Sequence, residues 1–467
     1  MKKLINRIFI RHLTVITFFV ISASCSYNEK QSMQQAYPVV KGSGNWPSFR
    51  GEYAGGVLDE QNLPDEWDAE SGKNIKWKTI IPGLAHSCPI VWEDKLIVTS
   101  AVSSIDTASF EHGLFGDGDA SIDTSEHKWM IFCLDKKTGK IIWERTAHQG
   151  IPKDKRHTKA TYNNSTPVTD GRYIVALFGS EGLYCYDMDG NFEWKRDIGR
   201  IDCGAYDAPE LEWGPASSPI IYQDLIIVQV DTQKESFILA CNIKSGQVVW
   251  KTERDELPSW GTPTIVTSKD YAALVTNSSN YIYGYDPFTG EELWRLDGSS
   301  KITAPTPVSC DSLIIVCSGR RPEAPIFAVR TGARGNISLQ DEQTSNEFVA
   351  WSKVRRGPYM PTPLIYRGFV YVLNNYGNFD CYELTTGKEI YRQMIDHKGG
   401  GFTASPAAAD GRIFCPSEDG EIFVVKSGPE FKVIAKNNLG ERLMASPAIS
   451  DSMIYFRAER HLFVVGQ

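Results

Sequence analysis

The sequence predicts an all-β protein built as an eight-bladed β-propeller of four-stranded blades. Eight prolines recur between residues 87 and 447 at separations of 41 to 78 residues, and a serine or threonine stands one or two positions before each of them. Repeats of about 40–50 residues are typical of propeller blades. A radial array of this kind can use all 467 residues as one closed body. The prolines are Pro89, Pro167, Pro219, Pro263, Pro307, Pro363, Pro406 and Pro447.

The repeat at residues 165–194 shows how one blade is built. It contains four short runs rich in β-branched and aromatic residues, at 165–168, 172–178, 182–187 and 190–194. Glycine-containing turns separate these runs, which is the pattern of consecutive antiparallel strands. We therefore expect four strands per repeat, and the first of them, which starts at the proline, to line the central channel.

A second motif marks the turn between the third and fourth strands. An Asp, Asn or Glu is followed three residues later by Thr or Ser, then directly by Gly, and four residues after the glycine by an aromatic residue. The acidic or amide side chain binds backbone N–H groups of the turn, and the glycine takes a positive φ. We expect the aromatic residue to pack between neighbouring blades. The four copies are Asp135/Thr138/Gly139/Trp143, Asn242/Ser245/Gly246/Trp250, Asp286/Thr289/Gly290/Trp294 and Glu383/Thr386/Gly387/Tyr391.

The last repeat has only three strand-like runs, at 446–449, 453–457 and 461–465. Its fourth strand is predicted at 75–78, before the first blade, where Trp77 stands in the position of the docking aromatic residue. A ring closed by strands from both ends of the chain has no exposed sheet edge at the junction.

The turn motif resembles the tryptophan-docking motif of the PQQ-like (quinoprotein) propeller family, Ala-x-Asp-x-x-Thr-Gly-x-x-x-Trp. The resemblance covers residues 46–467, includes the opening Trp46-Pro47-Ser48-Phe49-Arg50-Gly51, and extends to the assembly-factor branch known as BamB. Quinoprotein dehydrogenases of this family hold PQQ with a vicinal disulfide, a tryptophan floor and a calcium ion. The sequence has no adjacent cysteine pair and no Cys-x-x-Cys-His motif. The resemblance therefore implies no cofactor firmly, and PQQ stays an alternative that rests on the resemblance alone.

The beginning of the chain predicts export and lipid attachment. Basic residues precede an apolar run from Leu13 to Ile21, which is short for a membrane span. Small residues stand directly before Cys25 and resemble the bacterial lipobox. We expect a signal peptide at 1–24, a lipid on Cys25, a polar tether at 25–44 and the propeller at 45–467. Ordinary cleavage and an uncleaved anchor are the alternatives.

Composition limits the partners. The chain has 49 Lys and Arg against 57 Asp and Glu, and removal of the basic leader makes it more acidic still. Such a surface repels nucleic acid and offers no polybasic patch to a membrane. We expect membrane attachment through lipid alone and a monomeric propeller. The nine cysteines after Cys25 are an odd number, and we expect buried thiols rather than a disulfide framework or a metal site.

The residues just before the prolines predict a ligand site at one mouth of the channel. Aromatic and guanidinium groups together suit a flat anionic ligand or a peptide. The alternative is that bulky side chains simply plug a narrow channel. The insertions at 102–129 and 331–350 are expected either to carry recognition or to be solvated decoration. The candidate funnel residues are His86, Tyr162, Trp213, Trp260, Arg320, Arg355, Arg356, Tyr359, Phe402 and Arg442.

The sequence thus favours a lipid-anchored binding or scaffold protein of the bacterial envelope. A BamB-like role in outer-membrane protein assembly, with envelope proteins or a polymer as partners, is implied by the resemblance. A quinoprotein-type oxidoreductase with PQQ in the funnel is the enzymatic alternative, and we expect no catalytic residues if the binding role holds. A carbohydrate-binding propeller that uses Trp213 and Trp260 is the third possibility.

Overall fold

The computed structural model describes residues 44–105, 108–113, 115, 118–268, 271–310 and 312–467. The predicted signal peptide, Cys25 and all of the tether but its last residue lie outside these residues, so lipid attachment stays a prediction. The described part of the chain contains 35 strands and two short 3-10 helices, η1 (Glu52–Ala54) and η2 (Gly179–Glu181), which confirms the all-β class. No helix in it is long and apolar enough to cross a membrane.

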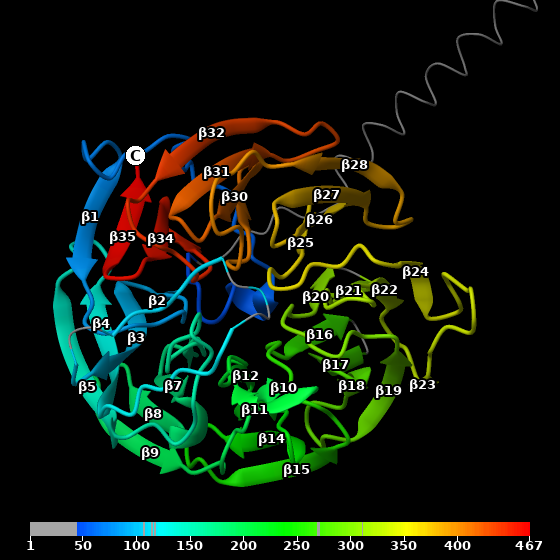
Figure 1. Cartoon of the computed structure of the whole chain (residues 1–467), viewed down its shortest axis with the longest axis horizontal. Helices are drawn as coiled ribbons and strands as arrows, with labels where there is room; N and C mark the ends of the chain where they lie inside the picture. Colours follow the sequence, from blue (N-terminus) through cyan, green and yellow to red (C-terminus); the bar gives the residue numbers. More distant parts are fainter. Residues whose placement is uncertain (1–43, 106–107, 114, 116–117, 269–270, 311) are drawn as a thin grey trace, which may run out of the picture. The chain divides into compact units, whose positions relative to one another are not determined.

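Eight antiparallel sheets form the blades of the ring, as Figure 1 shows. Blades one to four consist of β2 (Ile90–Trp92), β3 (Lys95–Ser103), β4 (His127–Asp135) and β5 (Ile141–Gly150); β6 (Val168–Thr169), β7 (Tyr173–Leu177), β8 (Leu183–Asp187) and β9 (Phe192–Arg196); β12 (Ile220–Tyr222), β13 (Leu225–Val230), β14 (Ser236–Asn242) and β15 (Val248–Arg254); and β16 (Thr264–Ser268), β17 (Tyr271–Asn277), β18 (Tyr281–Tyr285) and β19 (Glu292–Asp297).

Blades five to eight continue the pattern. They consist of β20 (Val308–Cys310), β21 (Leu313–Cys317), β22 (Ile326–Arg330) and β24 (Val349–Lys353); β25 (Leu364–Tyr366), β26 (Phe369–Leu373), β27 (Asn378–Glu383) and β28 (Glu389–Met394); β29 (Ala407–Ala409), β30 (Arg412–Pro416), β31 (Glu421–Lys426) and β32 (Val433–Asn438); and β33 (Ala448–Ser450), β34 (Met453–Arg457), β35 (His461–Gly466) and β1 (Ile75–Ile80). The hairpin β10 (Gly204–Ala205) and β11 (Ala208–Glu212) lies between blades two and three in the sequence.

The ring closes through a strand from the N-terminal side of the chain, as predicted. β1 pairs antiparallel with β35, with Thr79 opposite Leu462 and Lys78 opposite Phe463. Blade eight therefore combines three C-terminal strands with one strand that precedes blade one. The predicted eight-bladed propeller and its mode of closure are both confirmed.

The predicted docking of aromatic residues between blades is also confirmed. The indole N–H of Trp194 donates to the Ile243 carbonyl oxygen in the next blade at 2.8 Å, and a methyl group added to Gly246 would lie 2.6 Å from the Trp194 ring. A side chain at this glycine would displace the indole, so only glycine fits the turn. The same N–H to carbonyl contact, at 2.8–3.2 Å, is made by Trp77, Trp143, Trp250 and Trp351.

The insertion at 331–350 replaces this contact at the junction of blades four and five. Its short strand β23 (Gly335–Asn336) adds parallel to the outer edge of β19, and Ala333 and Ile337 are buried against blade four. The indole of Trp294 donates instead to the Tyr271 hydroxyl at 3.0 Å. Part of this insertion thus covers the outer edge of blade four and is not solvated decoration.

All nine cysteines in the described residues are free thiols, and eight of them are buried. Burial raises the pKa of Cys133 to about 12 and that of Cys241 to about 11. The expectation of buried thiols is confirmed for these eight, and Cys133, Cys185, Cys241, Cys381 and Cys415 pack as small apolar residues in the clusters between blades.

Candidate functional site: a blind pocket on the propeller axis

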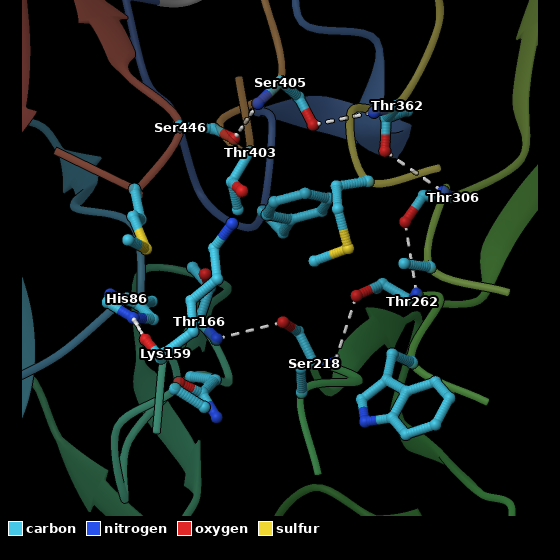
Figure 2. A pocket seen from close by; sticks show the side chains of 18 of the residues that line it. His86, Lys159, Thr166, Ser218, Thr262, Thr306, Thr362, Thr403, Ser405 and Ser446 are labelled. Carbon is cyan, nitrogen blue, oxygen red and sulfur yellow. Dashed lines mark hydrogen bonds between the residues drawn. The ribbon is translucent and has the colours of Figure 1, made fainter. Parts of the chain in front are cut away.

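The residue directly before each of the eight prolines faces the propeller axis, and seven of these residues carry a hydroxyl group. Each hydroxyl oxygen accepts the backbone N–H of the corresponding residue in the preceding blade, at 2.8–3.1 Å. Figure 2 shows the part of this series that runs from Thr166 to Ser446. Seven such bonds link the eight blades into a chain around the axis. Because each oxygen accepts one bond, its proton is left to rotate toward another acceptor. The members are Cys88, Thr166, Ser218, Thr262, Thr306, Thr362, Ser405 and Ser446.

A second layer follows two residues earlier in every blade. Because side chains alternate along extended chain, positions one and three before each proline face the same way. All eight members of this layer line a pocket of about 210 Å³ together with the first layer. They are His86, Asn164, Ala216, Trp260, Ala304, Met360, Thr403 and Met444.

The chain's own N-terminal segment closes one end of the pocket. Val57 and Trp46 form bridges with Ala408 and Val91, which lie two residues past the prolines of blades seven and one. The guanidinium of Arg50 is 1% exposed and donates to the carbonyl oxygens of Pro406 at 2.5 Å, Pro363 at 3.1 Å and Ala54 at 3.1 Å. Burial lowers its pKa to about 9.

Phe49, one residue before Arg50, lines the pocket from this side. The opening motif at 46–51 therefore has a structural role: it seals the axis and gives the pocket a floor. The pocket is blind, because the same segment that carries Phe49 is anchored to three blades through Arg50 and the two bridges.

The insertion at 102–129 and a second insertion, the segment between β5 and β6, form the open end. Lys159, from the segment between β5 and β6, is 9% exposed at its side chain, and its ammonium lies 2.5 Å from a carboxylate oxygen of Glu418 in blade seven. Glu418 also accepts the backbone N–H of Gly113 at 2.7 Å and the Thr403 hydroxyl at 2.5 Å. Burial lowers the pKa of Lys159, and the carboxylate of Glu418 opposes that shift. Glu418 thus ties both insertions to blade seven.

Aromatic side chains complete the wall. The rings of Trp213 and Trp260 lie 5.9 Å apart at 38°, and the Trp260 indole N–H donates to the Gly214 carbonyl oxygen at 2.8 Å. His157 meets Trp213 edge-on at 5.5 Å, and the Lys159 ammonium lies 3.8 Å from the centre of the Phe115 ring. The hairpin β10–β11 holds Trp213 in place, because the Trp213 backbone N–H donates to the Cys203 carbonyl oxygen at 2.7 Å.

His86 is a neutral wall residue. Its Nε2 lies 2.8 Å from the Lys159 carbonyl oxygen, which can only accept, so Nε2 carries the proton. Burial lowers the pKa of His86 to about 4. The imidazole therefore contributes no positive charge to the pocket at neutral pH.

Comparison with known families identifies the propeller. Residues 126–252 and 234–361 match a family model described as outer membrane protein assembly factor BamB, and these two segments together span just over half of the chain. The chain belongs to this BamB family of PQQ-like propellers. A comparison with curated proteins finds no match.

Solved structures of BamB and of quinoprotein dehydrogenases share the fold. BamB from Moraxella catarrhalis is 14% identical with a TM-score of 0.53, and the match covers 79% of this chain and 98% of that one. A europium-containing methanol dehydrogenase is 12% identical with a TM-score of 0.63, covering 92% and 99%. The quinohemoprotein alcohol dehydrogenase ADHIIG from Pseudomonas putida HK5 is 11% identical with a TM-score of 0.54, covering 91% and 80%.

The pocket lining of this family member does not fit PQQ. PQQ is a polycarboxylate, and its site must supply cations that are not already neutralised. Lys159 is paired with Glu418, and His86 is neutral. In the part of the chain that the structure describes, no cluster of three or more His, Cys, Asp or Glu residues could hold a metal ion.

Four of the ten candidate funnel residues line the pocket, namely His86, Trp213, Trp260 and Tyr359. The other two aromatic candidates face elsewhere. Phe402 is fully buried and packs on His397 and Phe423 inside the blade. Tyr162 lies under the Arg156 guanidinium and donates its hydroxyl proton to the Asp123 carbonyl oxygen.

None of the four arginine candidates lines the pocket. Arg442 pairs with Glu459 at 2.7 Å, and its guanidinium lies 4.9 Å from the centre of the Phe110 ring. Arg356 lies 3.6 Å from Glu389, and Arg355 is exposed. Arg320 contributes its backbone N–H to the Ser300 hydroxyl. The expected cluster of guanidinium groups around an anion is therefore absent from the described lining, which contains no arginine.

Sequence reasoning missed the polar pair Lys159 and Glu418 and the floor residue Phe49. The pair joins residues 259 positions apart through insertions that carry no repeat signal. The two methionines of the second layer could have been predicted from the sequence, because Met360 and Met444 stand three residues before a proline just as Trp260 does.

Proposed function

We propose that this protein is an exported binding propeller of the bacterial envelope, anchored by a lipid on Cys25, whose blind axial pocket holds an uncharged, mainly apolar group of a protein or polymer partner. The observation that carries this proposal is the sealed pocket itself. Its floor is Phe49, its walls include Trp260, Met360 and Met444, and its one ammonium group, Lys159, is neutralised by Glu418.

Three features support binding rather than chemistry. The pocket is built on the rigid inner strands of the ring, so its shape is set before a ligand arrives. The hydroxyl layer offers rotatable O–H donors without net charge. Methionine side chains adapt to irregular apolar ligands. Family membership supports an envelope role, since the family model is described as an outer membrane assembly factor.

The test is capture of partners from intact envelopes with a pocket-blocked variant. Ala304→Trp places an indole in the second layer, where Ala304 lines the pocket. Ser312→Trp, at an exposed turn of blade five, is the matched control. We expect the blocked variant to lose partners that the wild type and the control retain. Equal capture by all three proteins would overturn the pocket as the binding site.

The oxidoreductase alternative is tested directly on the wild-type protein. Addition of PQQ and Ca²⁺ is expected to give no bound chromophore, no thermal shift and no dye-linked dehydrogenase activity. A PQQ-dependent activity that the Ala304→Trp change abolishes would replace the binding proposal with the enzymatic one.

Carbohydrate binding is the second candidate, and the Trp213 and Trp260 pair favours it because aromatic faces stack on sugar rings. A glycan array would identify such a ligand, and Trp213→Ala and Trp260→Ala must then both abolish the signal. A signal that survives both changes would exclude the pocket as the sugar site.

A further inference from the structure

A groove separate from the axial pocket opens on the outer side of the ring between blades one and two. It has a volume of about 610 Å³, and strand β5 forms one wall while β8 and β9 form the other. Figure 1 shows β5 and β9 as consecutive strands on the rim. The residues that decide its chemistry are Arg145, His148, Tyr184, Tyr186, Phe192 and Lys195.

The groove exposes an aromatic residue at a repeat position that is acidic in blades four and six. Phe192 is 58% exposed and meets the Tyr186 ring edge-on at 5.6 Å. It stands two residues after the turn glycine of blade two, the position that Glu292 and Glu389 occupy in blades four and six. Blades one and three carry Ile141 and Val248 at this position, which are 40% and 46% exposed. Among these residues Phe192 is the one that lines the groove, where its ring is exposed next to Tyr184 and Tyr186.

Two cations flank the aromatic residues. The Arg145 guanidinium lies 5.4 Å from the centre of the Trp143 ring and donates from Nε to the Gly190 carbonyl oxygen at 2.7 Å, so its orientation is fixed. The Lys195 ammonium lies 4.9 Å from the centre of the Tyr184 ring. These contacts hold both positive charges at the groove before a ligand arrives.

Few negative charges oppose these cations. The lining of the groove contains no carboxylate among the residues that the structure describes. Glu181, which is not part of the groove lining, contacts His148, with 3.1 Å between Glu181 Oε2 and His148 Nε2. Burial lowers the pKa of His148, so Arg145 and Lys195 carry the charge of the groove. A positive, aromatic groove on a chain with a net charge of −8 is complementary to an acidic ligand.

We propose that this groove binds an extended acidic peptide segment of a partner protein, which places an apolar side chain against Phe192 and Tyr186 and carboxylates near Arg145 and Lys195. A peptide suits the site better than a smooth polyanion, because the groove combines aromatic side chains with two cations, and a chain of alternating acidic and apolar residues contacts both. This site is independent of the axial pocket and of the proposal made for it.

The experiment is fluorescence anisotropy of the full propeller with a labelled peptide of alternating Glu and Leu that contains one Phe. We expect saturable binding that weakens with added salt, and no binding of the same peptide with Lys in place of Glu. Lys195→Glu is expected to weaken binding at least about tenfold, which corresponds to about 1.4 kcal/mol. Lys251→Glu is the matched control, because Lys251 follows Trp250 in blade three as Lys195 follows Trp194 in blade two.

Specific outcomes would overturn the proposal. Equal loss in Lys195→Glu and Lys251→Glu would show non-specific charge attraction. Phe192→Ser must also weaken the peptide, and unchanged binding in that variant would remove the aromatic half of the site. Full displacement of the peptide by a short oligonucleotide or a sulfated oligosaccharide, with affinity that does not depend on Phe192, would assign the groove to polyanions instead.

Discussion

The ammonium of Lys159 and the carboxylate of Glu418 lie 2.5 Å apart and join an insertion after blade one to blade seven at the open end of the axial pocket. Both side chains are at least nine-tenths buried. Two charges taken out of water stabilise a fold only when each compensates the other. Their role is therefore to fix the position of the insertions over the pocket rather than to add stability for its own sake.

Loss of the Glu418 charge alone is expected to be costly. Glu418→Gln keeps the size of the side chain but leaves the Lys159 ammonium buried without its carboxylate, which should lower the free energy of unfolding by about 3–5 kcal/mol. Chemical denaturation measures this change. The double variant Lys159→Met/Glu418→Gln is expected to recover much of the loss. A double variant as unstable as Glu418→Gln would show that the ion pair is not the cause.

Removal of the Arg50 guanidinium is expected to loosen the pocket floor. Arg50→Met leaves the carbonyl oxygens of Pro363 and Pro406 without their donor and should cost about 2–4 kcal/mol of unfolding free energy. Limited proteolysis should then cut near residues 46–58 before the blades. Arg460→Met, at an exposed position, is the control and should change neither measurement. Unchanged protection of the segment in Arg50→Met would contradict the sealing role.

The turn glycine under a docking tryptophan is expected to tolerate no side chain. Gly246 and Gly440 both have a positive φ, of 63° and 74°, but only Gly246 lies against an indole, whereas nothing lies within 4 Å of a methyl group added at Gly440. Gly246→Ala should therefore lower the free energy of unfolding by about 1–3 kcal/mol more than Gly440→Ala. Equal losses would mean that backbone strain, not the contact with Trp194, explains the glycine.

The blades were predictable because their signals repeat, whereas the open end of the pocket was not. Residues of the inner strands obey the two-residue alternation of extended chain, so Trp260 and His86, three positions before their prolines, face the axis. The alternation does not hold four positions before the proline, because Phe402 is buried inside its blade whereas Tyr359, at the same position before Pro363, lines the pocket. The insertions carry no period, and long-range pairing such as that of Lys159 with Glu418 has no local signal in a single sequence.

Glu256 is expected to make the stability of the propeller depend on pH between about 4.5 and 7. The Glu256 carboxylate accepts the backbone N–H groups of Asn280 at 2.7 Å and Tyr281 at 3.0 Å, and burial raises its pKa from 4.5 to about 7, against the opposing charge of Arg254. The folded state thus holds a proton that the unfolded chain releases, so this contribution to stability is complete below pH 4.5 and is lost as the pH rises through 7. The loss is on the order of 2–3 kcal/mol.

In Glu256→Gln the amide cannot titrate, so the difference in unfolding free energy between the wild type and the variant should shrink steadily from pH 5 to pH 7.5 in denaturation curves. A difference that stays constant over this range would show that Glu256 is ionised throughout and that its two N–H bonds outweigh its burial.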